Sequence, residues 1–272
     1  MSTVTSRDGT TIAFDRVGEG PAVILVAGAF GDRSMMAPLA ALLAPRFTVY
    51  TYDRRGRGGS GDTTPYAVER EVEDIEALLD HAGAAAYAYG SSSGGVLALH
   101  AARRLAGISK LALYEPPFIV DDSYPPVPAD YPARITGLTA TGRPGDAVEL
   151  FLTFVGVTAE EIAQMRAEPF WRGLEAVAHT LAYDFAVMGE TQRGRPLPPA
   201  WASITTPTLV VDGAKTPQPY IRSGAEALAA RLPRARRHTI PDQDHAVAPD
   251  AIAPLLIEHF TDDFTDDRRT DR

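Results

Sequence analysis

Apolar residues follow two alternating patterns along this chain, and each pattern predicts one kind of element. Ala22–Val26 is a continuous apolar run, which is typical of a strand buried on both faces of a sheet. Val68–His81 instead carries its apolar residues at three- and four-residue spacing, which indicates a helix with one buried face. Repeated alternation of such strands and helices is typical of βαβ units. We therefore predict an α/β fold with a mostly parallel sheet and helices on both of its faces.

The same alternation covers most of the chain. Asp8-Gly9 is a turn signal ahead of the alternating segment Thr11–Asp15, so the chain is expected to open with an antiparallel hairpin. The further expected strands are Phe47–Tyr52, Ala85–Tyr89, Leu111–Tyr114, Thr208–Asp212 and Arg237–Ile240. The further expected helices are Ala37–Leu43, Gly94–Leu105, Ser223–Leu232 and Ile252–Phe260.

One long segment interrupts the alternation. It begins with the proline-rich stretch Tyr124–Pro128 and continues with helical patterns that no strand separates. These expected helices are Ala147–Val155, Ala159–Arg166 and Leu174–Val187. A helical insertion of about 85 residues has the size of a lid or small subdomain. The predicted organisation is a core domain of residues 1–117 and 205–262, a helical cap of residues 118–204, and a charged, disordered tail of residues 263–272.

A serine lies where one of the expected strands turns into a helix. Gly90-Ser91-Ser92-Ser93-Gly94 fits the pattern G-x-S-x-G only when Ser92 is central. In that pattern the nucleophilic serine occupies a sharp, strained turn, and small flanking residues let neighbouring backbone approach closely. Because a strand precedes the motif and a helix follows it, we interpret Ser92 as a nucleophile and not as part of a simple glycine- and serine-rich turn.

A serine nucleophile needs a base, and one of the six histidines is placed to serve as that base. His245 lies in the polar loop Pro241–His245, between the last expected strand and the last expected helix. Loops at the carboxyl edge of a parallel sheet converge on one crevice. The other histidines fall on expected helices, in the last strand or in the cap, so His245 is the predicted base.

Together these segments resemble the α/β-hydrolase superfamily. The likeness extends over the sheet domain and rests on the serine motif, on Asp244-His245, and on the turns Val26–Phe30 and Tyr52–Gly58. The resemblance implies an α/β-hydrolase fold and a triad in which an acid orients the histidine. In most of the superfamily that acid follows the seventh strand, where this chain has Thr216. A threonine cannot carry the negative charge that stabilises an imidazolium.

Two carboxylates are candidates for the missing acid. Glu115 ends the sixth strand, at one of the alternative acid positions known in the superfamily, and the two prolines after it restrict its backbone. Asp212 ends the seventh strand, ahead of Thr216. We predict Glu115, because it is expected to emerge beside the serine turn and gives the order Ser, Glu, His that this fold uses. Asp212 remains the alternative.

The oxyanion hole needs two backbone N–H groups aimed at the developing negative charge. Ser93, which follows the nucleophile, is expected to supply one of them. The turn Ala27–Phe30 resembles the family's His-Gly-x segment with Ala27 in place of the histidine, which makes Ala29 the second donor. The sequence contains no metal-binding motif and no phosphate-binding loop, and the glycine-rich Arg55–Gly61 matches a turn of the family. No metal and no cofactor are expected.

Aromatic residues are dense in the predicted cap and are candidates for the wall of a substrate pocket. Packing between cap helices explains aromatic residues there equally well. Few charges occur between Phe151 and Val157, which favours an uncharged, moderately hydrophobic substrate. The predicted substrate-binding residues are Phe30, Phe118, Phe154, Trp171, His179 and Tyr183.

Charge and composition bear on the partners. The formal net charge of −9 argues against nucleic acid, because phosphate binding needs clustered positive potential. The basic run Arg54, Arg55 and Arg57 is interpreted as part of a solvated loop. The chain has no cysteine, which excludes disulfides and a cysteine nucleophile.

The distribution of apolar residues bears on location. No apolar run approaches the ~20 residues that span a bilayer, and the first residues lack the apolar stretch of a signal peptide. We expect a cytoplasmic protein with a small-molecule substrate and no membrane partner. A homodimer is left open.

The predicted activity is hydrolysis of a carboxylic ester or lactone by Ser92, His245 and Glu115. Zearalenone lactonases share the glutamate after strand six and a Ser-Ser-Gly elbow, a local likeness that adds lactones to the candidate substrates. One alternative is a lyase, cyclase or carbon–carbon bond hydrolase that uses the same triad in secondary metabolism. Another is a ligand-binding protein of low turnover. Labelling with a fluorophosphonate distinguishes an active hydrolase from such a binder.

Overall fold

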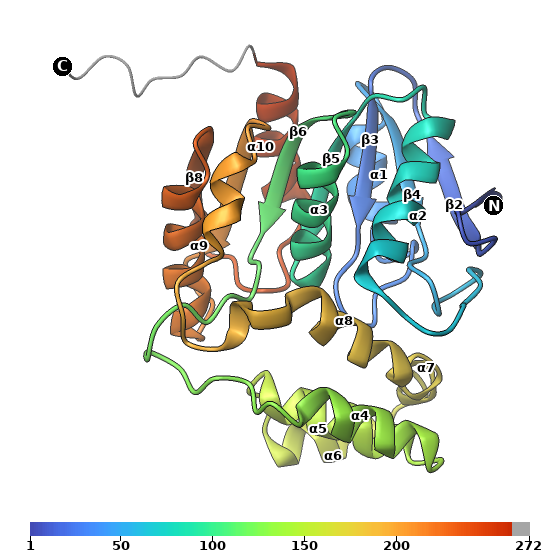
Figure 1. Ribbon diagram of the computed structural model, residues 1–272, viewed down its shortest axis with the longest axis vertical. Coiled ribbons are helices and arrows are strands. Elements are labelled where there is room, and N and C mark those ends of the chain that lie inside the picture. The colour runs from blue at the N-terminus through green and yellow to red at the C-terminus, as the bar shows by residue number, and fades with distance from the viewer. Residues whose placement is uncertain (263–272) are drawn as a thin grey trace.

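The predicted strands pair into a single eight-stranded sheet in the order β1-β2-β4-β3-β5-β6-β7-β8 (Figure 1). The computed structural model describes residues 1–262. Strands β1 and β2 form the expected antiparallel hairpin, β2 is antiparallel to β4, and the remaining pairs are parallel. The strands are β1 Ser2–Thr5, β2 Thr11–Val17, β3 Ala22–Val26, β4 Thr48–Tyr52, β5 Ala86–Ser91, β6 Ile108–Tyr114, β7 Thr208–Gly213 and β8 Ala235–Ile240.

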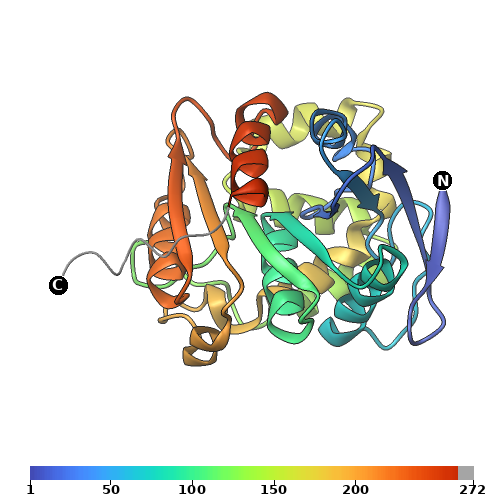
Figure 2. The same cartoon turned by 90° about the horizontal axis from the view of Figure 1, so that it is seen from above.

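Helices cover both faces of this sheet (Figure 2). One face packs against α1 Ala37–Leu43 and α10 Pro249–Thr261, and the other packs against α2 Val68–His81, α3 Ser93–Arg104 and α9 Pro219–Arg231. Side chains of a strand alternate between the two faces. In β3, Val23 and Leu25 therefore contact the first set of helices, whereas Ile24 and Val26 contact the second. This two-sided burial is the reason why the strand is apolar at every position.

The chain between β6 and β7 contains helices and loops but no strand. The helices are α4 Tyr131–Ala140, α5 Pro144–Phe154, α6 Ala159–Ala167, α7 Trp171–Ala176 and α8 Leu181–Met188, with short 3₁₀ helices η1 Ala178–Thr180, η2 Gly189–Gln192 and η3 Pro199–Ser203. Figure 1 shows α4, α5 and α6 beyond the carboxyl ends of the parallel strands, with α8 between them and the sheet. An eight-stranded, mostly parallel sheet with helices on both faces and a helical insertion confirms the predicted fold class.

The expected helix Leu174–Val187 is wrong in one respect, because the structure divides it into α7, η1 and α8. The break is centred on Thr180, whose hydroxyl donates to the Val177 carbonyl oxygen at 2.7 Å and accepts from Arg57 Nε at 3.1 Å. A threonine hydroxyl that bonds to nearby backbone competes with regular helix geometry. The contact with Arg57 is tertiary, so helical periodicity does not reveal it.

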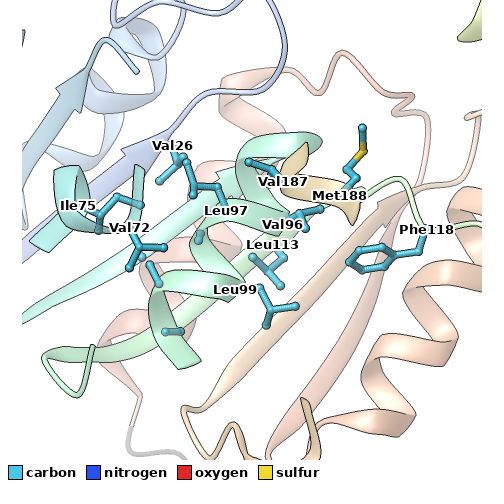
Figure 3. Close-up of a cluster of buried hydrophobic side chains, with 14 of the residues drawn as sticks. Val26, Val72, Ile75, Val96, Leu97, Leu99, Leu113, Phe118, Val187 and Met188 are labelled. Atoms are coloured by element: carbon cyan, nitrogen blue, oxygen red, sulfur yellow. The ribbon is translucent and has the colours of Figure 1, made fainter. Parts of the chain in front are cut away.

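Helix α8 also anchors the cap to the core. Figure 3 shows Val187 and Met188 of α8 in one apolar cluster with Val96 of α3, Leu113 of β6 and Phe118. These side chains are at most 5% exposed. The cap thus shares a hydrophobic core with the sheet domain and rests at the edge where the predicted catalytic residues emerge.

The arginine run is not solvated, which corrects the expectation from the sequence. Arg54, Arg55 and Arg57 are 1%, 1% and 2% exposed. Burying a cation is costly unless it is paired, and each of the three forms ion pairs with buried carboxylates. Their partners come from sequence positions far away, so local composition could not predict this burial.

No helix within residues 1–262 is long and apolar enough to cross a membrane. In the same part of the chain, no group of three or more His, Asp and Glu side chains is arranged to hold a metal ion. The predicted disorder of residues 263–272 lies outside the described residues.

Candidate active site

Ser92 occupies the sharp turn between β5 and α3. Its backbone has φ 53° and ψ −129°, a conformation that L-residues rarely adopt and that the surroundings must hold in place. The Ser92 N–H donates to the Tyr114 carbonyl oxygen at 2.8 Å. A side chain at Gly94 would collide with the Val26 carbonyl oxygen, and one at Gly90 would collide with Gly94 itself. The two glycines of the motif are therefore needed for close backbone approach.

His245 and Glu115 meet beside this turn. His245 Nδ1 lies 2.7 Å from Glu115 Oε2, although the two residues are separated by 130 positions in the chain. Glu115 is fully buried, and its other oxygen accepts from the Gly213 N–H at 2.8 Å and from the Thr216 hydroxyl at 2.6 Å. The His245 side chain is 48% exposed. The structure thus brings a buried, hydrogen-bonded carboxylate to one ring nitrogen and leaves the rest of the ring accessible.

Asp212 is turned away from the histidine. Its two oxygens accept from Arg237 at 2.9 and 3.0 Å, and both lie 3.2 Å from the Thr239 hydroxyl. Successive side chains of a strand point to opposite faces, and Asp212 belongs to β7 itself, where it pairs with neighbours on β8. Thr216, at the superfamily's usual acid position, donates to Glu115 instead. Of the two candidate acids, the geometry brings only Glu115 to His245.

The loop that carries His245 is attached to the ends of β6 and β7. The Lys215 N–H donates to the Gln243 carbonyl oxygen at 2.8 Å, and the Tyr114 hydroxyl donates to the Asp244 carbonyl oxygen. A side chain at Gly213 would collide with the Gln243 backbone. These contacts fix the loop directly before the histidine, so the ring position depends little on the exposed residues around it.

The predicted oxyanion donors, Ala29 and Ser93, belong to two segments that meet at Ser92. A Cβ added at Gly28 would be 3.0 Å from the Ser92 Cβ, so the turn Ala27–Phe30 touches the nucleophile. Ala29 and Ser93 both line the cavity in front of Ser92. The distances that define an oxyanion hole refer to a bound oxygen.

The cavity has a volume of about 450 Å³ and lies between core and cap. Ser92 and His245 both line it. Its apolar wall comes from the turn after β3, from α5 and α8, and from the start of α9. The principal apolar residues are Phe30, Met36, Phe151, Phe154, Met188 and Ile221.

Only two of the six predicted substrate-binding residues line this cavity, Phe30 and Phe154. Phe118 is fully buried against Trp201, and Trp171 is buried with its indole N–H donating to Glu175. Tyr183 stacks on Tyr66 and donates to Asp62, and His179 lies 3.5 Å from the same carboxylate. The assignment of these four residues to the pocket wall is therefore corrected: packing and cap-to-core contacts account for them. Phe151, Met188 and Ile221 take their place and were not predicted.

A buried charge network lies beneath the site and was also missed. It comprises Arg54 and Arg57 from the loop after β4, Glu71 from α2 and Asp184 from α8, and it includes the hydroxyl of Ser93. Burial would raise the pKa of Asp184, but Arg57 and Arg54 outweigh it and hold that pKa below its ordinary value. The sequence signal was an isolated aspartate in the otherwise apolar Leu181–Met188. A buried carboxylate must find a cationic partner.

The family follows from comparison with known proteins. The family model described as "Alpha/beta hydrolase family" matches residues 23–255, which is most of the chain. The chain belongs to the alpha/beta hydrolase family. Its solved relatives include an alpha/beta hydrolase from Sphaerobacter thermophilus, which is 56% identical and has a TM-score of 0.88. The match covers 96% of this α/β hydrolase and 100% of the relative.

More distant relatives include a protein named as an esterase, and a solved lactonase structure shares the fold. A pimeloyl-[acyl-carrier protein] methyl ester esterase of Xanthomonas campestris is 29% identical over 248 residues, which are 85% of this α/β hydrolase and 90% of the relative. The enol-lactonase of Burkholderia xenovorans has the same fold, with a TM-score of 0.70 at 23% identity over 96% of this chain and 100% of the other. The protein is a hydrolase enzyme.

Proposed function

We propose that this α/β hydrolase cleaves a carboxylic ester or a lactone through a triad of Ser92, His245 and Glu115. The observation that carries the proposal is the 2.7 Å contact between His245 Nδ1 and the buried Glu115 carboxylate, beside a serine in a strained turn. The relative from Xanthomonas campestris is named as a methyl ester esterase, which supports an ester as the substrate class.

The mechanism follows from the roles that these groups have in the geometry. A carboxylate at Glu115 only accepts hydrogen bonds, so Nδ1 carries a proton and Nε2 is free to act as a base. His245 Nε2 then takes the proton of the Ser92 hydroxyl as the serine attacks the carbonyl carbon. The N–H groups of Ala29 and Ser93 stabilise the oxyanion of the tetrahedral intermediate. His245 returns the proton to the leaving alcohol, and water hydrolyses the acyl-enzyme by the same sequence.

The lining of the cavity supports an uncharged acyl group. Among the described residues that line it, none is Lys or Arg, and the acidic Asp184 is ion-paired with two arginines. The apolar wall and a volume of about 450 Å³ suit a small to medium hydrophobic substrate. A substrate with a free carboxylate would have to lose its hydration without gaining a cationic partner.

The test is turnover together with covalent labelling of the serine. Wild-type protein is expected to react with a fluorophosphonate and to hydrolyse members of a panel of esters and lactones with uncharged acyl groups. Ser92→Ala should abolish labelling and lower kcat on the order of 10⁴-fold or more, since triad members act as a unit. Ser91→Ala, one residue earlier, should keep most of the activity. Retention of wild-type rates by Ser92→Ala would exclude the proposed mechanism. Cleavage of a carbon–carbon bond, or elimination or cyclisation without ester turnover, would point to the alternative reaction classes.

A further inference from the structure

The buried charge network links four charged side chains and is more than a single ion pair. Asp184 Oδ1 accepts from Arg54 Nη1 at 2.7 Å, and Asp184 Oδ2 accepts from Arg57 Nη2 at 2.7 Å. Arg54 in turn donates to both oxygens of Glu71 at 2.7 and 2.8 Å. All four side chains are at most 2% exposed. Two cations and two anions balance one another, so the cost of burying them is offset only while all four are present.

Each arginine also reaches the turn that carries the predicted oxyanion donor. Arg57 Nη1 donates to the Gly28 carbonyl oxygen at 2.6 Å, and Arg54 Nη1 lies 3.4 Å from the Ala27 carbonyl oxygen. The Gly28 carbonyl and the Ala29 N–H belong to one peptide group. In a trans peptide, the C=O and N–H bonds point in opposite directions. The Gly28 oxygen also accepts from the Gly31 N–H at 3.2 Å. Because Arg57 holds this oxygen on its own side, the Ala29 N–H points away from Arg57.

The segment with the other donor is tied to the same network. The Ser93 hydroxyl donates to Asp184 Oδ1 at 2.7 Å and lies 3.4 Å from Arg54 Nη1. Asp184 therefore contacts Ser93 directly and the Gly28–Ala29 peptide through Arg57. Of the four charged residues Arg54, Arg57, Glu71 and Asp184, only Asp184 belongs to the cap.

Electrostatics adds to this orientation. A guanidinium at the oxygen end of a peptide group withdraws electron density and makes its N–H a stronger donor. The effect is large where water is excluded. Burial and the neighbouring Arg54 cation lower the pKa of Arg57, and Asp184 opposes that lowering. An arginine remains charged at neutral pH. An oxyanion hole is effective because its donors are oriented before charge develops.

We propose that Arg57, held in place by Asp184 of the cap, is a positioning residue for the oxyanion hole. It fixes the Gly28–Ala29 peptide so that the Ala29 N–H faces the substrate, and docking of the cap thereby completes the hole. This inference rests on the proposed ester or lactone hydrolysis by Ser92.

The test compares Arg57→Met with Arg55→Met as a matched control. Arg55 is equally buried and donates to Asp74 at 2.7 and 2.8 Å and to Asp8 at 2.9 Å. None of its hydrogen bonds with the described residues involves Ala27, Gly28 or Ser93. End-point labelling with a fluorophosphonate counts the folded sites in each preparation. Per labelled site, Arg57→Met should lower kcat about 10²-fold with KM little changed, because an oxyanion donor acts in the transition state.

The affinity for an alkyl boronic acid is a second measurement, and a general loss of stability does not change it. It forms a tetrahedral adduct with the serine and places an oxygen in the oxyanion hole. Arg57→Met should weaken its binding by about the same factor as kcat/KM. Arg55→Met should lower the melting temperature but leave kcat and boronate affinity per labelled site at wild-type values.

Milder variants keep the test decisive if Arg57→Met does not fold. For Arg57→Lys, Asp184→Asn and Ser93→Ala, the loss of boronate affinity should follow the loss of kcat/KM. Losses of kcat/KM that come from KM alone, or boronate affinity that stays at the wild-type value, would overturn the inference. Equal behaviour of Arg57→Met and Arg55→Met per labelled site would also overturn it while leaving the proposed function intact. A wild type that neither labels nor turns over any ester or lactone would instead remove the proposed function itself, and the inference with it.

Discussion

Strained backbone marks the site at the level of single residues. Five described residues other than glycine have positive φ, and three of them are Phe30, Ser92 and Glu115. Such conformations cost on the order of 1 kcal/mol each and persist only where the surroundings enforce them. The Glu115 N–H donates to the Val211 carbonyl oxygen at 2.9 Å, and Ser92 is held from β6 in a comparable way. Phe30 and Ser92 line the cavity, and Glu115 contacts His245, so three of the five strained positions belong to the site.

Glu115→Gln tests the acid at this scale. Glutamine keeps the size of the side chain and one oxygen acceptor but removes the charge that stabilises the imidazolium and selects its tautomer. We expect kcat to fall about 10²- to 10⁴-fold per labelled site, with little change in KM. Steady-state kinetics on the best ester of the panel measures this.

Asp212→Asn is the control for that substitution. It removes the charge that Arg237 pairs with, so the melting temperature should fall, but the contact between His245 and Glu115 is left intact. An inactive Asp212→Asn together with a fully active Glu115→Gln would show that the acid has been assigned to the wrong residue.

At the scale of elements, one face of α8 performs two structural tasks, because Asp184, Val187 and Met188 are three and four residues apart. Val187 and Met188 pack into the core, while Asp184 reaches the arginines and the serine turn. Helix α5 contributes the wall of the cavity through Phe151 and Phe154. The cap therefore controls the catalytic edge through α8 and the size of the substrate space through α5.

Phe154→Ala is expected to change which acyl chain fits. Phe154 lines the cavity and packs against Tyr131 in a tilted arrangement and edge-on against Phe185, so its removal should lengthen the space in front of Ser92. We predict a higher ratio of kcat/KM for long over short acyl esters, at a cost of about 3 kcal/mol in the free energy of unfolding. An ester series of increasing acyl length and a urea titration measure the two effects.

Trp171→Ala is the matched control in the same cap. The indole is buried but does not line the cavity, so this change should reduce stability without altering the ratio between long and short esters. A shift of that ratio in Trp171→Ala equal to the one in Phe154→Ala would mean that general loosening of the cap sets chain-length preference.

The whole molecule is expected to lose stability in mild acid before its carboxylates titrate. His259 of α10 is 8% exposed, and its Nε2 lies 3.0 Å from the Leu111 carbonyl oxygen. Burial lowers the pKa of His259 from 6.5 to about 4. Between these values the unfolded chain binds a proton that the folded chain does not, so the free energy of unfolding falls as the pH falls from 6.5 to 4. The contribution of His259 is about 3 kcal/mol.

His259→Gln keeps a hydrogen-bond donor for the Leu111 carbonyl but cannot take up a proton. Urea titrations at pH 7, 6, 5 and 4 should show a flatter dependence of the free energy of unfolding on pH for this variant than for wild type. His238→Gln, which changes an exposed side chain of β8, should follow the wild-type curve. If the His259→Gln curve has the wild-type slope, the acid sensitivity originates elsewhere, for example at the partly buried His100, whose pKa burial also lowers.

Local sequence patterns predict the strands, the turn at Ser92 and the order of the elements. Strands buried on both faces are apolar at every position, so Ala22–Val26 could be recognised without knowing its neighbours. The turn at Ser92 requires small residues on both sides, and its glycines are visible in the chain. The order of elements also places His245 and Glu115 at the same sheet edge, because parallel strands end together. Fold class and the geometry around Ser92 were predictable for these reasons.

What local patterns do not report is which distant side chains meet. Arg54 is interpreted from the sequence as part of a solvated loop, but the crossovers of the sheet and the docking of α8 bury it together with Glu71 and Asp184. The pattern of apolar residues does not show whether a side chain faces a cavity or packs against another side chain. For this reason four of the six predicted substrate-binding residues do not line the cavity. Glu115 and Asp212 lie at the ends of the adjacent strands β6 and β7. Which of them contacts His245 depends on the direction of each side chain. Such choices depend on packing between segments up to 130 residues apart, which only the folded chain brings into contact.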